Sequence, residues 1–283
     1  MLRVPHHTFK RIHFMSDSYE PGISVCFVIK NGIRQGYPFW ESLKSCLSFA
    51  DEVVISDGYS DDGTLDVLKK FIEMHEDQAK FRLYLDDWNM HRSGCGEVIA
   101  AMSAINFRRC EREWVYYLQA DEVLHEENSD FVRDIADNHS EEFNSVIFRF
   151  AHFIHAWEPL PPGQAYDEAI RMVKNDRRIK FLGDAWTFTG AIAPTCPAGL
   201  GPKPIYHLGW VFPKNCDVKS IEHAKLYAGR RDYQASAKRA KQNLAADQYA
   251  TGFDANGTFS DYPAGVERLI GMVEYKLPAE ALP

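Results

Sequence analysis

Short apolar runs alternate with segments of helical spacing along the first part of the chain. Each apolar run has the length of one buried strand, and the runs occupy residues 23–29, 52–56, 81–85 and 114–118. Between them, apolar residues recur at intervals of three and four over residues 38–49, from Thr64 onwards, and over residues 96–109. Near-continuous apolar strands separated by amphipathic helices are typical of a parallel sheet covered by helices. The pattern therefore predicts an α/β fold.

The pattern changes in the second half of the chain. From residue 145 to residue 212, strand-like runs alternate with loops rich in Pro and Gly. Residues 217–248 have a helical pattern with seven Lys or Arg against four Asp or Glu, and one further helix is predicted near residues 266–275. We expect the basic helical segment to be a solvated surface, and a peripheral contact with a membrane or a large acceptor is the alternative.

Composition and charge argue against some classes of function and indicate the cellular compartment. The chain has 283 residues and a formal net charge of -8, which argues against nucleic-acid binding because phosphate contacts need clustered Lys and Arg. Six scattered cysteines without a Cys-x-x-Cys pair indicate free thiols in a reducing compartment. The N-terminal segment lacks the apolar core of a signal peptide, and no run approaches the roughly 20 apolar residues of a membrane span. We expect a cytoplasmic protein, with membrane association as the alternative.

Polar segments follow two of the predicted strands at the point where each strand ends. The first is Asp57-Gly-Tyr-Ser-Asp-Asp-Gly-Thr64, and the second is Gln119-Ala-Asp-Glu122. In parallel sheets, ligands bind at the carboxyl ends of the strands. A carboxylate there can accept hydrogen bonds from a ribose or a base, and an acidic pair suits a divalent cation with phosphate ligands. A tight turn and a solvated acidic loop are the simpler explanations of the two segments.

In their order along the chain, these segments and the first strand resemble the family 2 glycosyltransferases of the GT-A fold. The resemblance covers residues 23–31, 49–64 and 117–124, which match the opening strand with its Lys-Asn end, the Asp- and Gly-rich loop and the acidic strand end of that family. It implies a GT-A-type, Rossmann-like mixed sheet flanked by helices, with a helical C-terminal extension.

The resemblance also implies a division of the chain. A catalytic domain is expected over residues 1–212, followed by the helical extension over residues 213–283. Within the domain, the nucleotide-sugar part is expected at about residues 23–125 and the acceptor part at about residues 126–212.

Individual residues receive roles in donor binding, some from the same resemblance and some from the chemistry of the side chain. Lys30 and Asn31 are expected beside the nucleotide, and Asp57 at its base or ribose. Arg92, beside His91, suits a diphosphate through the bidentate geometry of arginine, although a solvated loop is equally consistent with this segment. The full set predicted to bind the donor is Lys30, Asn31, Asp57, Tyr59, His91, Arg92, Gln119, Ala120 and Asp121.

A divalent cation, Mn²⁺ or Mg²⁺, is a further implication of the resemblance. Asp121 matches the last Asp of the family's metal motif, and His207 resembles the late His that completes such a site, although a His between apolar residues is also common as a structural residue. The family's first Asp is Gln119 here, and an amide is a poorer cation ligand than a carboxylate. Three outcomes stay open: a weaker metal site, a site completed by Glu122, or transfer without a metal.

The acceptor side has two candidate catalytic bases and two candidate stacking residues. Direct displacement at an anomeric carbon needs a carboxylate that takes the acceptor's proton, and Asp184 is the first candidate with Glu168 second. An ordinary surface carboxylate is an equally good interpretation of each. Trp186 and Trp210 are predicted to bind the acceptor by stacking on sugar faces, or else to belong to the core.

The sequence therefore predicts a hexosyltransferase-type glycosyltransferase. It would move a sugar from a nucleoside-diphosphate sugar, a UDP-sugar by preference, to a hydroxyl of a glycan, lipid-linked or protein acceptor with inversion. A nucleotidyltransferase is one alternative, but the segment Lys30-Asn31-Gly32-Ile33-Arg34 is poor in glycine for a phosphate loop. A catalytically inactive sugar-nucleotide-binding protein of the same fold is the other, and Gln119 favours it.

Overall fold

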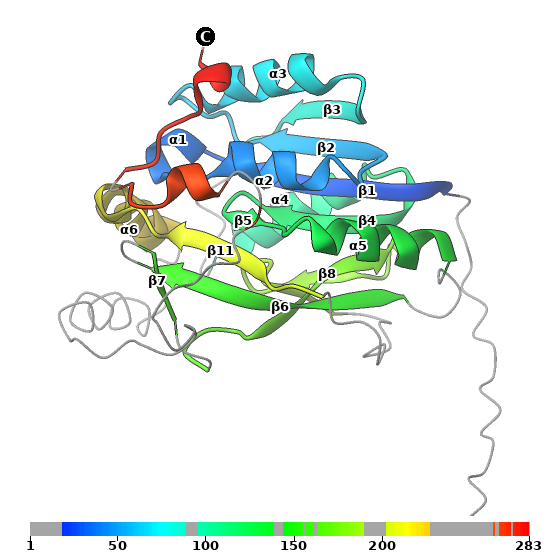
Figure 1. The fold of residues 1–283 in the computed structure, drawn as a ribbon. Helices are drawn as coiled ribbons and strands as arrows, with labels where there is room; N and C mark the ends of the chain where they lie inside the picture. The colour runs from blue at the N-terminus through cyan, green and yellow to red at the C-terminus, as the bar shows by residue number, and fades with distance from the viewer. Residues whose placement is uncertain are drawn as a thin grey trace, which may run out of the picture.

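The computed structural model describes most of the chain. The described residues are 19–88, 96–138, 144–154, 157–160, 163–189, 202–226, 263, 266–272 and 274–282. Within them the chain forms one large mixed sheet with helices on both faces (Figure 1).

The large sheet contains nine strands in the described part of the chain. These are β1 (Glu20–Ile29), β2 (Glu52–Asp57), β3 (Lys80–Leu85), β4 (Arg112–Gln119), β5 (Glu122–Val123), β6 (Ser145–Ile154), β7 (Glu158–Pro159), β8 (Glu168–Lys174) and β11 (Ile205–Trp210). Their order is β3-β2-β1-β4-β8-β6-β11-β5, with β7 beside β6. The first four neighbours pair in parallel, whereas β8 is antiparallel to both β4 and β6. The parallel half thus places the carboxyl ends of β1, β2 and β4 along one edge.

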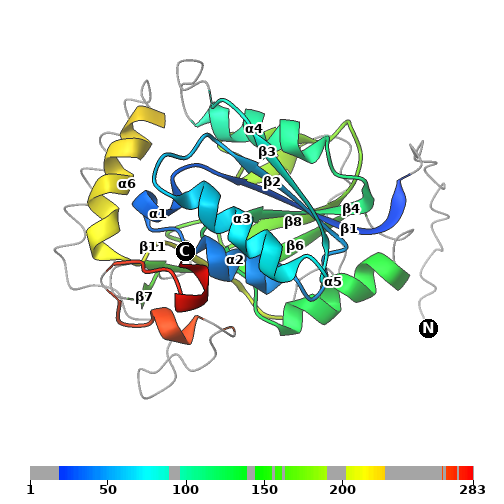
Figure 2. The same ribbon diagram turned by 90° about the horizontal axis from the view of Figure 1, so that it is seen from above.

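Helices cover the two faces of the sheet unequally. They are α1 (Gly32–Gln35), α2 (Phe39–Cys46), α3 (Thr64–His75), α4 (Glu97–Phe107), α5 (Glu127–Asn138) and α6 (Pro213–Leu226). One core lies under α2, α3 and α5, and the other lies under α4 and the small hairpin of β9 (Lys180–Leu182) and β10 (Thr187–Thr189). In Figure 2, α6 lies next to α1 at the end of the sheet where β1 terminates.

Burial on both faces explains the continuous apolar runs. Phe27 of β1 packs into the first core and Cys26 into the second, and both are fully buried. On β4, Tyr116 packs into the first core and Tyr117 into the second. A strand covered on both faces has no row of side chains that faces solvent, so its sequence lacks the alternation of a half-exposed strand.

The predicted fold class is confirmed, and one local prediction is wrong. Helix α3 begins at Thr64 as expected, with Gly63 at the cap position and the Thr64 N–H donating to the Asp62 carboxylate at 3.0 Å. The helix predicted near residues 266–275 is a short 3₁₀ turn, Glu267–Leu269, because the chain turns away at Gly271, whose φ is 81°. The division into donor and acceptor parts stays a prediction.

Helix α6 is the longest described helix of the predicted C-terminal extension. Its first residue is Pro213, whose missing N–H costs nothing at the first helical position. Asn215 packs against Gly36 at the end of α1, where a Cβ would lie 2.4 Å from the Asn215 side chain. The close approach of α6 to α1 therefore depends on a glycine whose φ is 70°. Among the described helices, none has the length and apolar character needed to cross a membrane.

Candidate functional site

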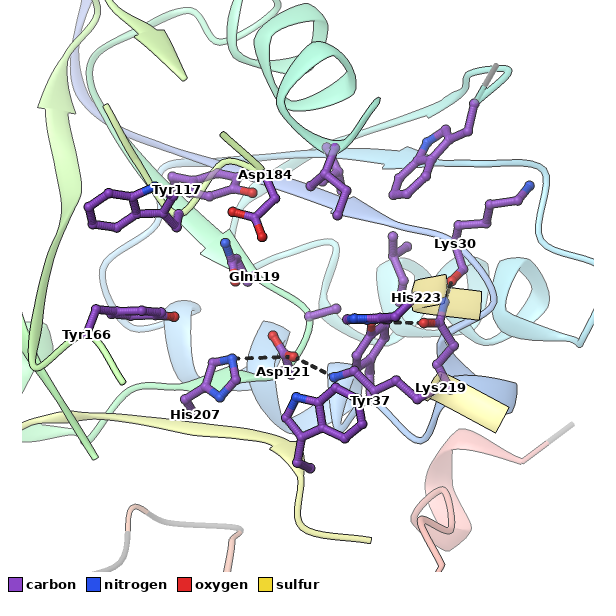
Figure 3. Close-up of a pocket in the computed structure, with 18 residues that line it drawn as sticks. Lys30, Tyr37, Tyr117, Gln119, Asp121, Tyr166, Asp184, His207, Lys219 and His223 are labelled. Carbon is purple, nitrogen blue, oxygen red and sulfur yellow. Dashed lines mark hydrogen bonds and ion pairs between the residues drawn. The ribbon is translucent and has the colours of Figure 1, made fainter. Parts of the chain in front are cut away.

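A pocket of about 320 Å³ opens at the carboxyl ends of β1 and β4. Its walls come from the ends of these strands, from the turn before β10, from β11 and from α6. In Figure 3, Asp121 lies between His207 and Lys219, to which dashed lines connect it. The polar side chains that line the pocket include Lys30, Gln119, Asp121, Asp184, His207, Lys219 and His223.

The Asp-rich loop after β2 is tightly folded by its own side chains. The buried Asp57 carboxylate accepts hydrogen bonds from the Ser60 N–H at 2.8 Å and the Ser60 hydroxyl at 2.6 Å. Asn31, in the left-handed region with φ 52°, accepts the Asp61 N–H at 3.0 Å. Asp57, Asn31 and Tyr59 do not line the pocket, and the Tyr59 side chain is exposed. In this structure, Asp57 and Asn31 shape the loop.

The pocket wall beside this loop is made by Lys30 and Trp88. The Lys30 ammonium donates a hydrogen bond to the Gly58 carbonyl. A Cβ at Gly58 would lie 2.9 Å from both the Lys30 side chain and the Trp88 ring. Glycine at this position therefore lets the loop approach the two side chains that line the pocket.

Asp121 lies at the turn between β4 and β5, and little of it is exposed. Its Oδ2 is 3.6 Å from the His207 Nε2 and 3.2 Å from the Lys219 Nζ. Burial raises the pKa of Asp121, but the two basic neighbours outweigh burial and hold that pKa at about 2. Asp121 is therefore an anion at neutral pH.

His207 reaches Asp121 from β11. This strand pairs antiparallel with β5, which places His207 opposite Glu122, the residue after Asp121. Burial lowers the pKa of His207 to about 3, against the opposing effect of the Asp121 carboxylate. At neutral pH the ring is therefore neutral and can offer one N–H and one lone pair.

Lys219 and His223 enter the pocket from α6, and sequence reasoning gave them no role in the site. The Lys219 side chain is 1% exposed. Residues four apart lie on the same face of a helix, so both side chains point from α6 into the pocket. The only sequence signal is the local excess of Lys and Arg after residue 217, a pattern that predicts a solvated surface.

A buried ion pair holds β5, the strand that follows Asp121. The Arg171 guanidinium of β8 donates to both oxygens of Glu122, at distances from 2.6 to 3.1 Å, and neither side chain is exposed. Arg171 also donates to the Ile170 and Trp186 carbonyls, at 3.0 and 2.8 Å. Both carboxylate oxygens of Glu122 thus accept hydrogen bonds from Arg171, which disfavours Glu122 as a metal ligand.

The turn between β9 and β10 carries Asp184 and Trp186 into the pocket. Ala185 between them is fully buried and has φ 68°, a left-handed conformation that costs an L-residue about 1 kcal/mol. The Gln119 side-chain amide donates to the Ala185 carbonyl at 3.3 Å, which links this turn to the end of β4. In Figure 3, Asp184 lies next to Gln119 and across the pocket from Lys219.

The predicted site residues fall into three groups. Those brought together around the pocket are Lys30, Gln119, Ala120, Asp121, Asp184, Trp186, His207 and Trp210. Those that do not line it are Asn31, Asp57, Tyr59 and Glu168, of which Glu168 is exposed on β8. His91 and Arg92 lie outside the described residues.

The residues around Asp121 do not fit a divalent cation. In the described part of the chain, no group of three or more His, Cys, Asp or Glu side chains could hold a metal ion. The pair Asp121 and His207 supplies one carboxylate and one imidazole, and the Lys219 ammonium lies beside the same carboxylate oxygen. A divalent cation there would be repelled by the ammonium.

Comparisons with known proteins point to glycosyltransferases. The chain is 23% identical over 145 residues to the SPbeta prophage-derived glycosyltransferase SunS of Bacillus subtilis (strain 168), and equally to glycosyltransferase SunS of Bacillus phage SPbeta. Each match covers 50% of this chain but only 30% of the relative. No family model matches the chain, so membership of family 2 stays a prediction.

Two solved structures are also similar in part. TarS 1-349 of S. aureus in complex with UDP has 14% sequence identity and a TM-score of 0.39, over 70% of this chain and 63% of that chain. Mannosyltransferase PcManGT of Pyrobaculum calidifontis in complex with GDP-Man and Mn²⁺ has 20% identity and a TM-score of 0.34, over 48% and 36% of the two chains.

Proposed function

We propose that the protein is a glycosyltransferase that takes a sugar from a nucleoside-diphosphate sugar and passes it to an acceptor hydroxyl. The observation that carries the proposal is the pocket at the carboxyl ends of β1 and β4. In this pocket, Asp121 with its neighbours His207 and Lys219 (the Asp121 cluster) lies opposite Asp184. The sequence similarity to the SunS glycosyltransferases and the three ordered motifs support the same class of reaction.

The proposed chemistry is a single displacement with inversion. Asp184 takes the proton of the acceptor hydroxyl, whose oxygen attacks the anomeric carbon of the donor sugar. The bond between that carbon and the phosphate oxygen breaks, and the nucleoside diphosphate leaves with the electron pair. Trp186, which is 39% exposed at the pocket, offers a ring face for a sugar. A UDP-sugar is the expected donor.

Product analysis tests this function directly. The purified chain is incubated with UDP- and GDP-sugars and with mixed glycan, lipid-linked and peptide acceptors, and the released nucleotide is identified. We expect nucleoside diphosphate release that falls to background in Asp184→Asn and Asp121→Ala. Glu168→Gln is the matched control, because that carboxylate lies outside the pocket, and it should keep most of the activity.

The products also separate the competing functions. Release of pyrophosphate in place of a nucleoside diphosphate would indicate a nucleotidyltransferase. Saturable binding of a nucleotide sugar without turnover of any donor would indicate an inactive binding protein. Full activity of Asp184→Asn would show that Asp184 is not the catalytic base, although the protein would still be a transferase.

A further inference from the structure

The Lys219 ammonium occupies the place beside Asp121 where the resemblance leads one to expect a divalent cation. Its Nζ lies 3.2 Å from the Asp121 Oδ2 and 2.8 Å from the Gly209 carbonyl oxygen. We propose that Lys219 is the cation that binds the diphosphate of the donor, so that nucleotide binding needs no metal ion. This inference rests on the proposed function, because it assigns the diphosphate subsite of the same pocket.

The surroundings of Lys219 form a built site for a fixed positive charge. The ammonium lies 4.4 Å from the centre of the Tyr37 ring and 4.8 Å from that of Trp210, so two aromatic faces stabilise it while it is almost fully buried. A long, flexible lysine is thereby held in one position. Such preorganisation strengthens binding, because the side chain loses little freedom when the ligand arrives.

Gly209 shows how closely the cluster is packed. A Cβ at this position would lie 2.3 Å from the Asp121 Oδ2 and 2.6 Å from the Lys219 Nζ. Only glycine lets β11 pass the ion pair at this distance. The glycine between Leu208 and Trp210 in the sequence is therefore explained by the ammonium and the carboxylate that meet above it.

Lys219 has the donors that a diphosphate needs. An ammonium carries three N–H groups, and among the described residues two acceptors, Asp121 and the Gly209 carbonyl, take two of them. The third can reach a phosphate oxygen in the pocket that Lys219 lines. His223, one helical turn further along α6, lines the same wall and adds a ring nitrogen to it.

Calorimetric titration of the full chain tests the inference by binding alone. UDP, GDP, CDP, ADP and dTDP are titrated in EDTA and again in Mn²⁺. We expect at least one nucleotide to bind in EDTA with a Kd within about threefold of its value in Mn²⁺. Lys219→Met should weaken that binding by about 10- to 100-fold in both buffers, the loss of one charged hydrogen-bond donor.

Two further variants keep the result interpretable. The double variant Asp121→Asn/Lys219→Met removes both charges, so that no unpaired carboxylate is left to repel the diphosphate, and it should still bind the nucleotide more weakly than the wild type does. Lys214→Met on the same helix is the control, because this lysine is exposed and pairs with Glu274. It should bind like the wild type, and thermal melting shows whether each variant is folded.

Three results would overturn the inference. Binding by a folded double variant at wild-type strength would show that Lys219 does not hold the diphosphate. Binding that appears only with Mn²⁺ would show that the nucleotide needs a metal ion, and the proposed function would still hold. A failure of every nucleotide to bind in either buffer would remove both the inference and the proposed function.

Discussion

Loss of the Arg171 side chain should be among the most destabilising single changes at the site. In Arg171→Met, the Glu122 carboxylate stays fully buried but loses all three of its hydrogen bonds from the guanidinium. Removing one partner of a buried pair leaves an uncompensated charge and costs about 3–5 kcal/mol. For a chain of this size, that loss corresponds to a fall in Tm of roughly 10 °C.

The double variant Glu122→Leu/Arg171→Met should recover a large part of this loss. With both charges gone, the carbonyls of Ile170 and Trp186 are the main groups that lose a donor. At about 1 kcal/mol for each hydrogen bond, the double variant should lie about 2 kcal/mol below the wild type. Its turnover should still fall, because the pair connects the strand after Asp121 to the turn before β10.

Urea denaturation, followed by the intrinsic fluorescence, measures the free energy of unfolding of each variant. Lys69→Met is the control, because its exposed pair with Asp66 should contribute less than about 0.5 kcal/mol. This prediction is refuted if Arg171→Met lowers the free energy of unfolding by less than about 1 kcal/mol. It is also refuted if the double variant loses as much stability as Glu122→Leu and Arg171→Met lose in total when each is measured alone.

Three other predictions follow from the geometry. Asp184→Asn should lower kcat by about 10²- to 10⁴-fold with little change in the Kd of the donor, measured by steady-state kinetics and titration. Gly209→Ala should weaken nucleotide binding and lower Tm, because its Cβ would displace the Asp121 carboxylate. Arg109→Met should cost about 1–2 kcal/mol at pH 7, and the difference from wild type should shrink as the pH falls below about 4.

The sign of the pH effect follows from the pair at the end of β3. Arg109 donates to both oxygens of Asp86, at 2.6 and 2.7 Å, and these hydrogen bonds lower the pKa of Asp86. A carboxylate whose pKa is lowered in the folded state stabilises above its unfolded pKa and loses this effect as the pH falls through the folded value. Arg108→Met, an exposed neighbour, is the control. A difference between Arg109→Met and wild type that stays constant from pH 7 to pH 3 would contradict this.

Much of the fold could be predicted because the burial of each strand and helix determines the pattern of apolar residues within that segment. The runs of β1, β2 and β4 are continuously apolar since both of their faces are covered, and the helices between them keep helical spacing. The Asp-rich loop was also visible, but its role was not. Whether Asp57 faces a ligand or Ser60 depends on local side-chain geometry, which residue types alone do not reveal.

The electrostatics of the site could not be predicted, since they depend on contacts between distant segments. Lys219 is buried only because α6 packs against α1 and places the ammonium against Asp121. Lysine is rarely buried, so its interpretation as a solvated residue followed the usual behaviour of the side chain. The Arg171–Glu122 pair likewise joins two strands, β8 and β5, that are separated in the sequence by α5, β6 and β7.

A crystal structure of the protein grown with UDP and EDTA would test the central claim most directly. We predict that the nucleotide lies at the carboxyl ends of β1 and β4, with a phosphate oxygen within hydrogen-bonding distance of the Lys219 Nζ and with Asp184 on the far side of the pocket. A nucleotide bound elsewhere on the molecule, or a diphosphate with no contact to α6, would contradict it.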